Sequence, residues 1–152
     1  MTSPIFDILV DSREQCPWLF SSISPMPTII TQGLKSGDYS IQGFEESGIC
    51  IERKSLPDLF GSCGKGRDRL EKEFQRMSEF QYSAIIIERS FASIIKNPPV
   101  NTRMNPKAVF HTLISWSIKY NVHVWPAEDR IMAEKICYSL FDKFWKQQLE
   151  MI

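Results

Sequence analysis

The stretch that decides the fold is ICIERK, residues 49–54, in which three apolar residues are followed directly by three charged ones. A short apolar run of this kind is typical of a buried β-strand, and its charged end then lies where the strand reaches solvent. Side chains alternate between the two faces of a strand, so Glu52 and Lys54 share one face and Arg53 lies on the other. The stretch therefore predicts a strand that ends in an adjacent carboxylate and ammonium group.

The rest of the chain alternates between strand and helix signals. Five further segments have the apolar or β-branched character of strands, namely residues 5–10, 28–31, 39–42, 84–87 and 122–125. Spacing or capping signals mark four helices, namely residues 55–60, residues 67–80, one that opens at Asn105-Pro106 and one from Asp129 onward. Residues 61–66 and 97–105 are predicted as loops. The order of elements predicts a mixed α/β sheet flanked by helices, in a single domain that spans residues 1–152.

The composition is that of an ordinary globular domain, with 43% hydrophobic and 24% charged residues among 152. The formal net charge is zero, but phosphate binding requires only a local basic surface. The four cysteines form no CxxC pair and the two histidines lie far from them, which argues against a structural zinc site. The N-terminus lacks a signal peptide, and no apolar run approaches the roughly 20 residues of a membrane helix. We expect a reduced, intracellular, soluble protein.

Charged side chains stand at the ends of three predicted strands: Asp11 with Glu14, Asp38, and Glu52 with Lys54. Two carboxylates from neighbouring strands provide the oxygen ligands that Mg²⁺ or Mn²⁺ prefers, and a nearby lysine offsets charge on a phosphate. The pattern favours metal-dependent phosphodiester hydrolysis, which requires neither a serine nucleophile nor a histidine base. The spacing alone also fits solvated surface residues.

The letters around these positions resemble the XPF family of structure-specific endonucleases. The family signature is G-D, a variable stretch and then E-R-K-x-x-x-D, and this chain matches it with Gly37-Asp38, Glu52-Arg53-Lys54 and Asp58. The segment VDSRE at 10–14, the Gly66-Arg67 pair and the strand before Glu88 also follow the family order. The resemblance implies the restriction-endonuclease-like fold of the PD-(D/E)XK superfamily and cleavage of branched or otherwise structured DNA.

The resemblance also implies a role for each matched residue. Asp38 and Glu52 would be direct metal ligands, the Arg53 backbone carbonyl a third ligand, and Lys54 would position the attacking water. The expected supporting residues complete the acidic cluster, hold phosphates or orient the acids, and they are Asp11 (as a further metal ligand), Glu14, Arg13, Arg53, Asp58 and Arg67. A mobile loop that delivers Lys65 and Arg67 to the DNA backbone is weighed against a plain solvated connection.

Two further expectations concern assembly. Family members usually carry tandem helix-hairpin-helix repeats after the nuclease domain, whereas this chain ends at Ile152, so the choice of DNA structure is left open. The helix from Asp129 carries Phe141, Phe144 and Trp145, more aromatic surface than one sheet face requires. Because the nuclease domains of the family pair through their C-terminal helices, we expect a homodimer.

Alternatives remain beside each hypothesis. The chain would be a catalytically inactive DNA-binding or scaffold subunit if the fold were kept without the chemistry, although such subunits typically lose the acids or the lysine. The metal chemistry alone fits RNA or another phosphodiester equally. Arg13 and Glu14 would form an ordinary surface ion pair, the helix 67–80 presents a solvated charged face, and the two histidines are interpreted as structural residues in apolar surroundings.

Overall fold

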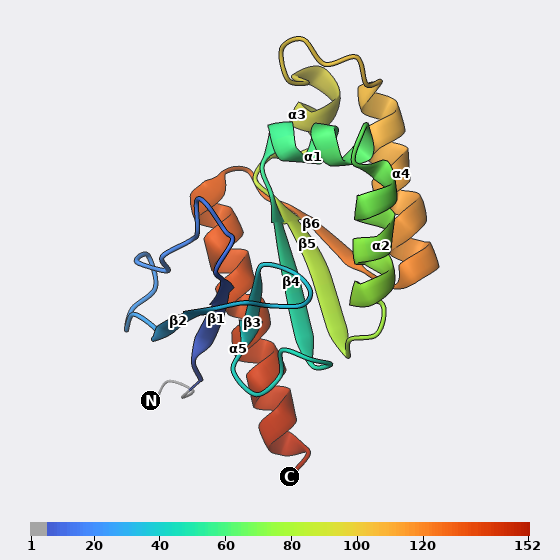
Figure 1. The fold of residues 1–152 in the computed structure, drawn as a ribbon. Helices are drawn as coiled ribbons and strands as arrows, with labels where there is room; N and C mark the ends of the chain where they lie inside the picture. Colours follow the sequence, from blue (N-terminus) through green and yellow to red (C-terminus); the bar gives the residue numbers. More distant parts are fainter. Residues whose placement is uncertain (1–5) are drawn as a thin grey trace.

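A computed structural model describes residues 6–152, which fold around one six-stranded mixed sheet (Figure 1). The strand order across the sheet is β2-β1-β3-β4-β5-β6. The elements are β1 (Ile8–Asp11), β2 (Ile29–Gln32), β3 (Tyr39–Ile41), β4 (Ile49–Lys54), α1 (Leu56–Cys63), α2 (Arg67–Met77), β5 (Tyr82–Ile87), α3 (Phe91–Lys96), α4 (Pro106–Tyr120), β6 (His123–Pro126) and α5 (Arg130–Glu150).

The sheet combines an antiparallel centre with parallel flanks. Strand β3 runs antiparallel to β1 and β4, whereas β2 is parallel to β1, and β4, β5 and β6 are parallel to one another. Residues 83–87 of β5 are all buried, as expected for a parallel strand covered on both faces. The carboxyl ends of β4 and β5 therefore lie at the same edge of the sheet, which places Lys54 beside Ile87.

Helices cover both faces of the sheet, and each face has its own hydrophobic core. Helix α5 packs on one face through Ala133, Cys137 and Phe141, against inward residues of β1, β3, β4 and β5. Helices α1, α2 and α4 cover the other face of β4 and β5, and their core contains Leu59, Phe74 and other apolar residues. In Figure 1, α5 runs behind the sheet while α1, α2 and α4 form a separate group beside β4 and β5.

The predicted fold class is confirmed, and most predicted elements lie within two residues of their observed bounds. The strand at 49–54 and the helix starts after the caps Asn105 and Asp129 are confirmed. Of the predicted strand 5–10, residue 5 lies outside the described residues. The loop at 61–66 is wrong in part, because α1 continues to Cys63, and the helix predicted over 67–80 ends at Met77. Helix α3, which Ser90 caps, was not predicted.

Across residues 6–152, none of the helices combines the length and the hydropathy that crossing a membrane requires.

Candidate active site

The side chains of Asp38 and Glu52 lie close together at the junction of β3 and β4. Asp38 directly precedes β3, and its backbone N–H donates to the Ile51 carbonyl over 2.8 Å. Its Oδ2 accepts a hydrogen bond of 2.8 Å from the backbone N–H of Arg53. The carboxyl groups of Asp38 and Glu52 lie close enough for each to influence the pKa of the other. The two predicted metal ligands are therefore neighbours, although they are 14 positions apart in the chain.

Burial makes both carboxyl groups reluctant to ionise. It raises the pKa of Glu52 well above its ordinary value, and the proximity of the Asp38 carboxyl group raises it further. Burial also raises the pKa of Asp38, against the opposing effects of the adjacent Glu52 and of the hydrogen bond from the Arg53 N–H. The charge of Lys54 lowers both values. A positive charge placed between the two acids would therefore stabilise their ionised forms.

Gly37 makes the position of Asp38 possible. Its φ of 72° lies in the left-handed region, where glycine is not penalised. A Cβ atom at this position would lie 2.5 Å from the Cys50 sulfur and 2.9 Å from the Ile51 carbonyl oxygen. The close approach of Gly37 to β4 thus requires a residue without a side chain. This approach places the next residue, Asp38, beside Glu52.

Lys54 and Glu52 open into one solvent-accessible cavity of about 470 Å³. The Lys54 ammonium donates to the Ser62 hydroxyl of α1 over 3.0 Å, which holds the side chain at the cavity wall. Asp58, in the first turn of α1, lines the same cavity and is exposed. The two-residue spacing correctly predicted that Glu52 and Lys54 share a face of the strand.

Glu73 of α2 is a third acid at this cavity, and the sequence interpretation placed it on a solvated helix face. Its Oε1 accepts a 2.7 Å hydrogen bond from the Gly37 N–H, and its other oxygen pairs with Arg76. Its charge contributes to the raised pKa of Glu52. A helical stripe of Arg69, Glu73 and Arg76 lines the cavity, and that spacing is the signal that could have identified it.

The Arg53 side chain lies on the opposite face of β4 from Glu52 and Lys54, as predicted. Its guanidinium donates to both oxygens of Glu14 over 2.8 and 2.9 Å and to Glu88 over 2.9 Å. Burial favours the neutral form of Glu14, but the hydrogen bonds and charge of Arg53 outweigh burial and lower its pKa. Because two carboxylates hold this buried guanidinium, the expectation that it holds a phosphate is not supported, and its contacts fit an orienting role.

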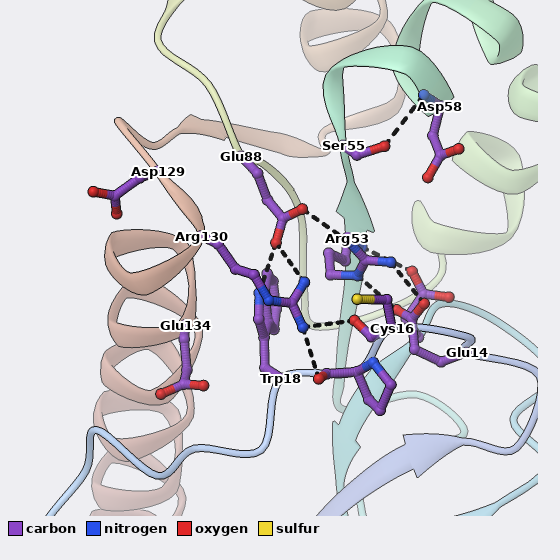
Figure 2. Close-up of polar contacts among 12 residues, drawn as sticks. Glu14, Cys16, Trp18, Arg53, Ser55, Asp58, Glu88, Asp129, Arg130 and Glu134 are labelled. Carbon is purple, nitrogen blue, oxygen red and sulfur yellow. Dashed lines mark hydrogen bonds and ion pairs between the residues drawn. The ribbon is translucent and has the colours of Figure 1, made fainter.

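Glu88 joins three segments of the chain behind the active site (Figure 2). Besides Arg53, it accepts hydrogen bonds from the Trp18 indole over 2.9 Å and from Arg130 over 3.0 Å. Arg130, in the first turn of α5, also donates to the carbonyl oxygens of Cys16 and Pro17. The loop after β1, strand β4 and the start of α5 thus meet at one buried carboxylate. Sequence reasoning did not assign roles to Trp18 and Arg130.

The expected acidic cluster of four residues is not formed through direct contacts. Both oxygens of Asp11 accept from Arg13, over 3.0 and 3.3 Å, and one also accepts from the Leu34 N–H over 2.9 Å. Glu14 is engaged by Arg53. The surface pair expected between Arg13 and Glu14 is therefore wrong, because each has a different partner. Asp11 has contacts that fix the loop after β2 and is not brought into contact with Glu52.

The basic residues after α1 separate into two groups. Lys65 is exposed, which fits both the DNA-contacting loop and the plain solvated connection. Arg67 instead donates to the Thr112 hydroxyl over 3.1 Å and stacks over the Trp116 ring of α4. A mobile loop that carries Arg67 to DNA is therefore not supported. The two histidines, His111 and His123, are exposed, but each ring lies against an aromatic side chain, so the interpretation of them as residues in apolar surroundings is confirmed only in part.

Within residues 6–152, no group of three or more His, Cys, Asp or Glu side chains is arranged to hold a metal ion. The oxygen-rich centre instead consists of the Asp38–Glu52 pair beside Lys54. A mixed six-stranded sheet that presents Glu52 and Lys54 at one cavity, with Asp38 next to Glu52, has the architecture of an XPF-type nuclease domain. A model of the ERCC4 domain matches residues 10–140, and the chain belongs to the ERCC4 domain family.

Solved structures confirm the fold. The chain is similar to XPF from Aeropyrum pernix, with a TM-score of 0.68 and 20% identity over 94% of this chain and 65% of that one. It is similar also to XPF from Aeropyrum pernix in complex with DNA, with a TM-score of 0.68 and 21% identity over 90% and 63% of the two chains. The chain thus spans slightly less than two thirds of these relatives. A comparison with curated proteins gave no match.

Proposed function

We propose that this chain is a divalent-metal-dependent endonuclease that hydrolyses phosphodiester bonds in branched or otherwise structured DNA. The observation that carries the proposal is the proximity of the Asp38 and Glu52 carboxyl groups, with Glu52 and Lys54 together in an open cavity. Membership of the ERCC4 domain family supports the same activity. The roles given below to individual residues are part of the proposal.

The donor set fits Mg²⁺ or Mn²⁺. Asp38 and Glu52 supply carboxylate oxygens, which these hard cations prefer, and burial makes the pair unfavourable as two anions without a cation. The Arg53 carbonyl would be the third ligand, since the C=O of a strand residue points to the same edge as its N–H, which binds Asp38. When bound, the ion would polarise the phosphate and lower the pKa of a coordinated water.

The remaining side chains position the reactants. The Lys54 ammonium, held by Ser62, would orient the attacking water and offset charge on the phosphate oxygens. The backbone N–H of Arg53 holds the Asp38 carboxylate in place, and Glu14 and Glu88 fix the Arg53 side chain. Arg13 would act through Asp11, and Asp58 would support Lys54 from the cavity wall.

The alternative function is that of an inactive DNA-binding or scaffold subunit. It predicts loss of the acids or the lysine, whereas all three residues are present, with Asp38 next to Glu52 and Lys54 in the same cavity as Glu52. We therefore favour the enzyme. Hydrolysis of RNA or of another phosphodiester is treated as an outcome of the test below.

We propose further that the chain forms a homodimer through its C-terminal helices. The sequence suggested this dimer because the C-terminal helix carries Phe141, Phe144 and Trp145. That reason is wrong, because these side chains pack against the core of the same chain. Support comes instead from Ile131 and Met132, which are exposed near the start of α5. Light scattering should give twice the chain mass of 17.6 kDa, and a monomer at micromolar concentration would count against the dimer.

A panel of labelled substrates tests the enzyme proposal. It contains single strands, duplexes, flaps, forks and four-way junctions, with an RNA copy of the single strand, each incubated with Mg²⁺, Mn²⁺ or chelator. We expect internal cleavage of branched DNA with either ion and none with chelator. Failure to cut every substrate in both metals would contradict the proposal, and preferential cleavage of RNA would correct the substrate.

A further inference from the structure

A second cavity of about 800 Å³ lies between the end of α1 and the loop 97–104. It shares Pro57 and Gly61 with the walls of the active-site cavity, so the two hollows adjoin. A Cβ atom added to Gly61 would meet no heavy atom within 4 Å, so the shared wall is open at this point. A chain-like ligand that lies in the active site can therefore continue into this second cavity.

The charges along this cavity have one sign. Its lining contains Lys65 and Arg103, both exposed, and it contains no aspartate or glutamate. Neither cation forms an ion pair with any residue in the described range 6–152. The active-site cavity, by contrast, is lined by acids as well as bases. We call this second cavity the basic groove.

The walls of the basic groove are held by specific contacts. The turn after α1 approaches the loop closely, since a Cβ atom at Gly64 would lie 3.4 Å from the Met104 side chain. Within the loop, the Met104 N–H donates to the Thr102 hydroxyl over 3.2 Å, the Thr102 N–H donates to the Pro99 carbonyl over 3.3 Å, and Asn101 adopts a left-handed φ of 68°. Arg103 therefore lines the groove from the loop, on the side opposite α1.

We infer that the basic groove binds the sugar-phosphate backbone of the DNA strand that flanks the scissile phosphate. Lys65 and Arg103 are positioned to contact phosphates after the strand leaves the acids, because backbone contacts of this kind fix register and carry no sequence information. This inference rests on the proposed nuclease function and adds the path of the substrate. The inference gives Lys65 a role in DNA binding and gives Arg67 none, because Arg67 is held by Thr112 and Trp116 of α4.

Salt-dependent DNA binding tests the groove. Anisotropy of a labelled fork is measured with Ca²⁺ in place of Mg²⁺, so that binding is followed without cleavage. Each of Lys65→Gln and Arg103→Gln should reduce the slope of log affinity against log salt by about 0.9, and the double variant by about 2. The control is Lys119→Gln, an exposed lysine at the far end of α4 from the loop, which should leave the slope unchanged.

The outcomes separate the groove from the enzyme proposal. A double variant with the affinity and slope of the wild type overturns the groove, as does a wild-type protein that does not bind the fork. If the wild type cuts DNA while the double variant binds normally, only the groove is wrong. If the wild type binds through Lys65 and Arg103 but cuts nothing with Mg²⁺ or Mn²⁺, only the enzyme proposal is wrong.

Discussion

The backbone N–H of Arg53 and the Oδ2 of Asp38 are joined by a 2.8 Å hydrogen bond that connects the two faces of β4. On one face Asp38 meets Glu52, and on the other the Arg53 guanidinium is held by Glu14 and Glu88. The buried network of Arg53, Glu14 and Glu88 is therefore connected to the proposed metal ligand Asp38 through the Arg53 backbone. Changes on either face should affect cleavage, but through different properties of the protein.

Loss of any of the three central side chains should abolish cleavage without unfolding the protein. Asp38→Asn and Glu52→Gln remove metal-ligand charge, and Lys54→Ala removes the cation beside the phosphate, so rates should fall by at least about 10²–10³-fold. Lys35→Ala, at an exposed lysine nearby in sequence, is the control and should stay active. Circular dichroism would verify folding, and an active Glu52→Gln variant would count decisively against the assignment.

Glu73 should contribute by positioning Gly37 and Asp38. Glu73→Gln keeps an acceptor for the Gly37 N–H, whereas Glu73→Ala leaves that donor without its 2.7 Å partner. We expect the glutamine variant to retain most activity and the alanine variant to lose about tenfold, equivalent to about 1.4 kcal/mol of transition-state stabilisation. Equal, severe losses in both would show instead that the Glu73 charge itself is required. Glu79→Ala, at an exposed acid after α2, is the matched control.

Glu88 should matter for stability as well as for activity. Its removal leaves the buried Arg53 with one carboxylate partner and releases Trp18 and Arg130. Breaking a buried pair in this way costs about 3–5 kcal/mol, so Glu88→Ala should lower the denaturant midpoint strongly. Its neighbour Arg89 is exposed, and Arg89→Ala should change stability by about 0.5 kcal/mol or less. A Glu88→Ala protein as stable as the wild type would contradict the network.

The buried acids predict how stability depends on pH without metal. Because the pKa of Glu52 is raised above its ordinary value of 4.5, its neutral form stabilises the fold at low pH. That contribution is lost as pH rises from 4.5 through the raised value, by about 1.4 kcal/mol for each pKa unit. Glu52→Gln should therefore be more stable than wild type at pH 8 and similar to it near pH 4.

The measurement is thermal unfolding in chelator at several pH values, followed by addition of Mn²⁺. The ion should raise the melting temperature of the wild type at pH 8 and have less effect on Glu52→Gln, since binding to the native state stabilises it. An identical pH dependence of the two proteins in chelator would show that Glu52 is not strained by burial.

Local patterns in the sequence predicted the strands, the caps and the alternation along β4. The period of a strand is two, so the separation of Arg53 from Glu52 and Lys54 followed directly. Helix α3 was missed because six residues, Phe91–Lys96, give too short a pattern to distinguish from a loop. The cap at Asn105 was found because its signal lies within three residues, whereas at Asp129 only the start of the helix was predicted and not the cap.

Partners distant in sequence were not predictable from one sequence. Glu73 reaches Gly37 because Leu70, Phe74 and Met77 set the rotation of α2 on the sheet, and that rotation depends on the whole core. Trp18 meets Glu88 across 70 positions of chain. The motif identified Asp11 and Glu14 as acids, but their cationic partners decide where each carboxylate is directed.

Gly37 has no reactive atom, yet its missing Cβ is what lets the chain pass against Cys50 and deliver Asp38. If every residue were replaced in turn, substitutions of Gly37 should therefore reduce function as severely as substitutions of Asp38 and Glu52. Even alanine, the smallest chiral replacement, would have to push the strand aside. The proposed site therefore depends on a position that must stay free of side-chain atoms, and a search for functional groups alone would not identify it.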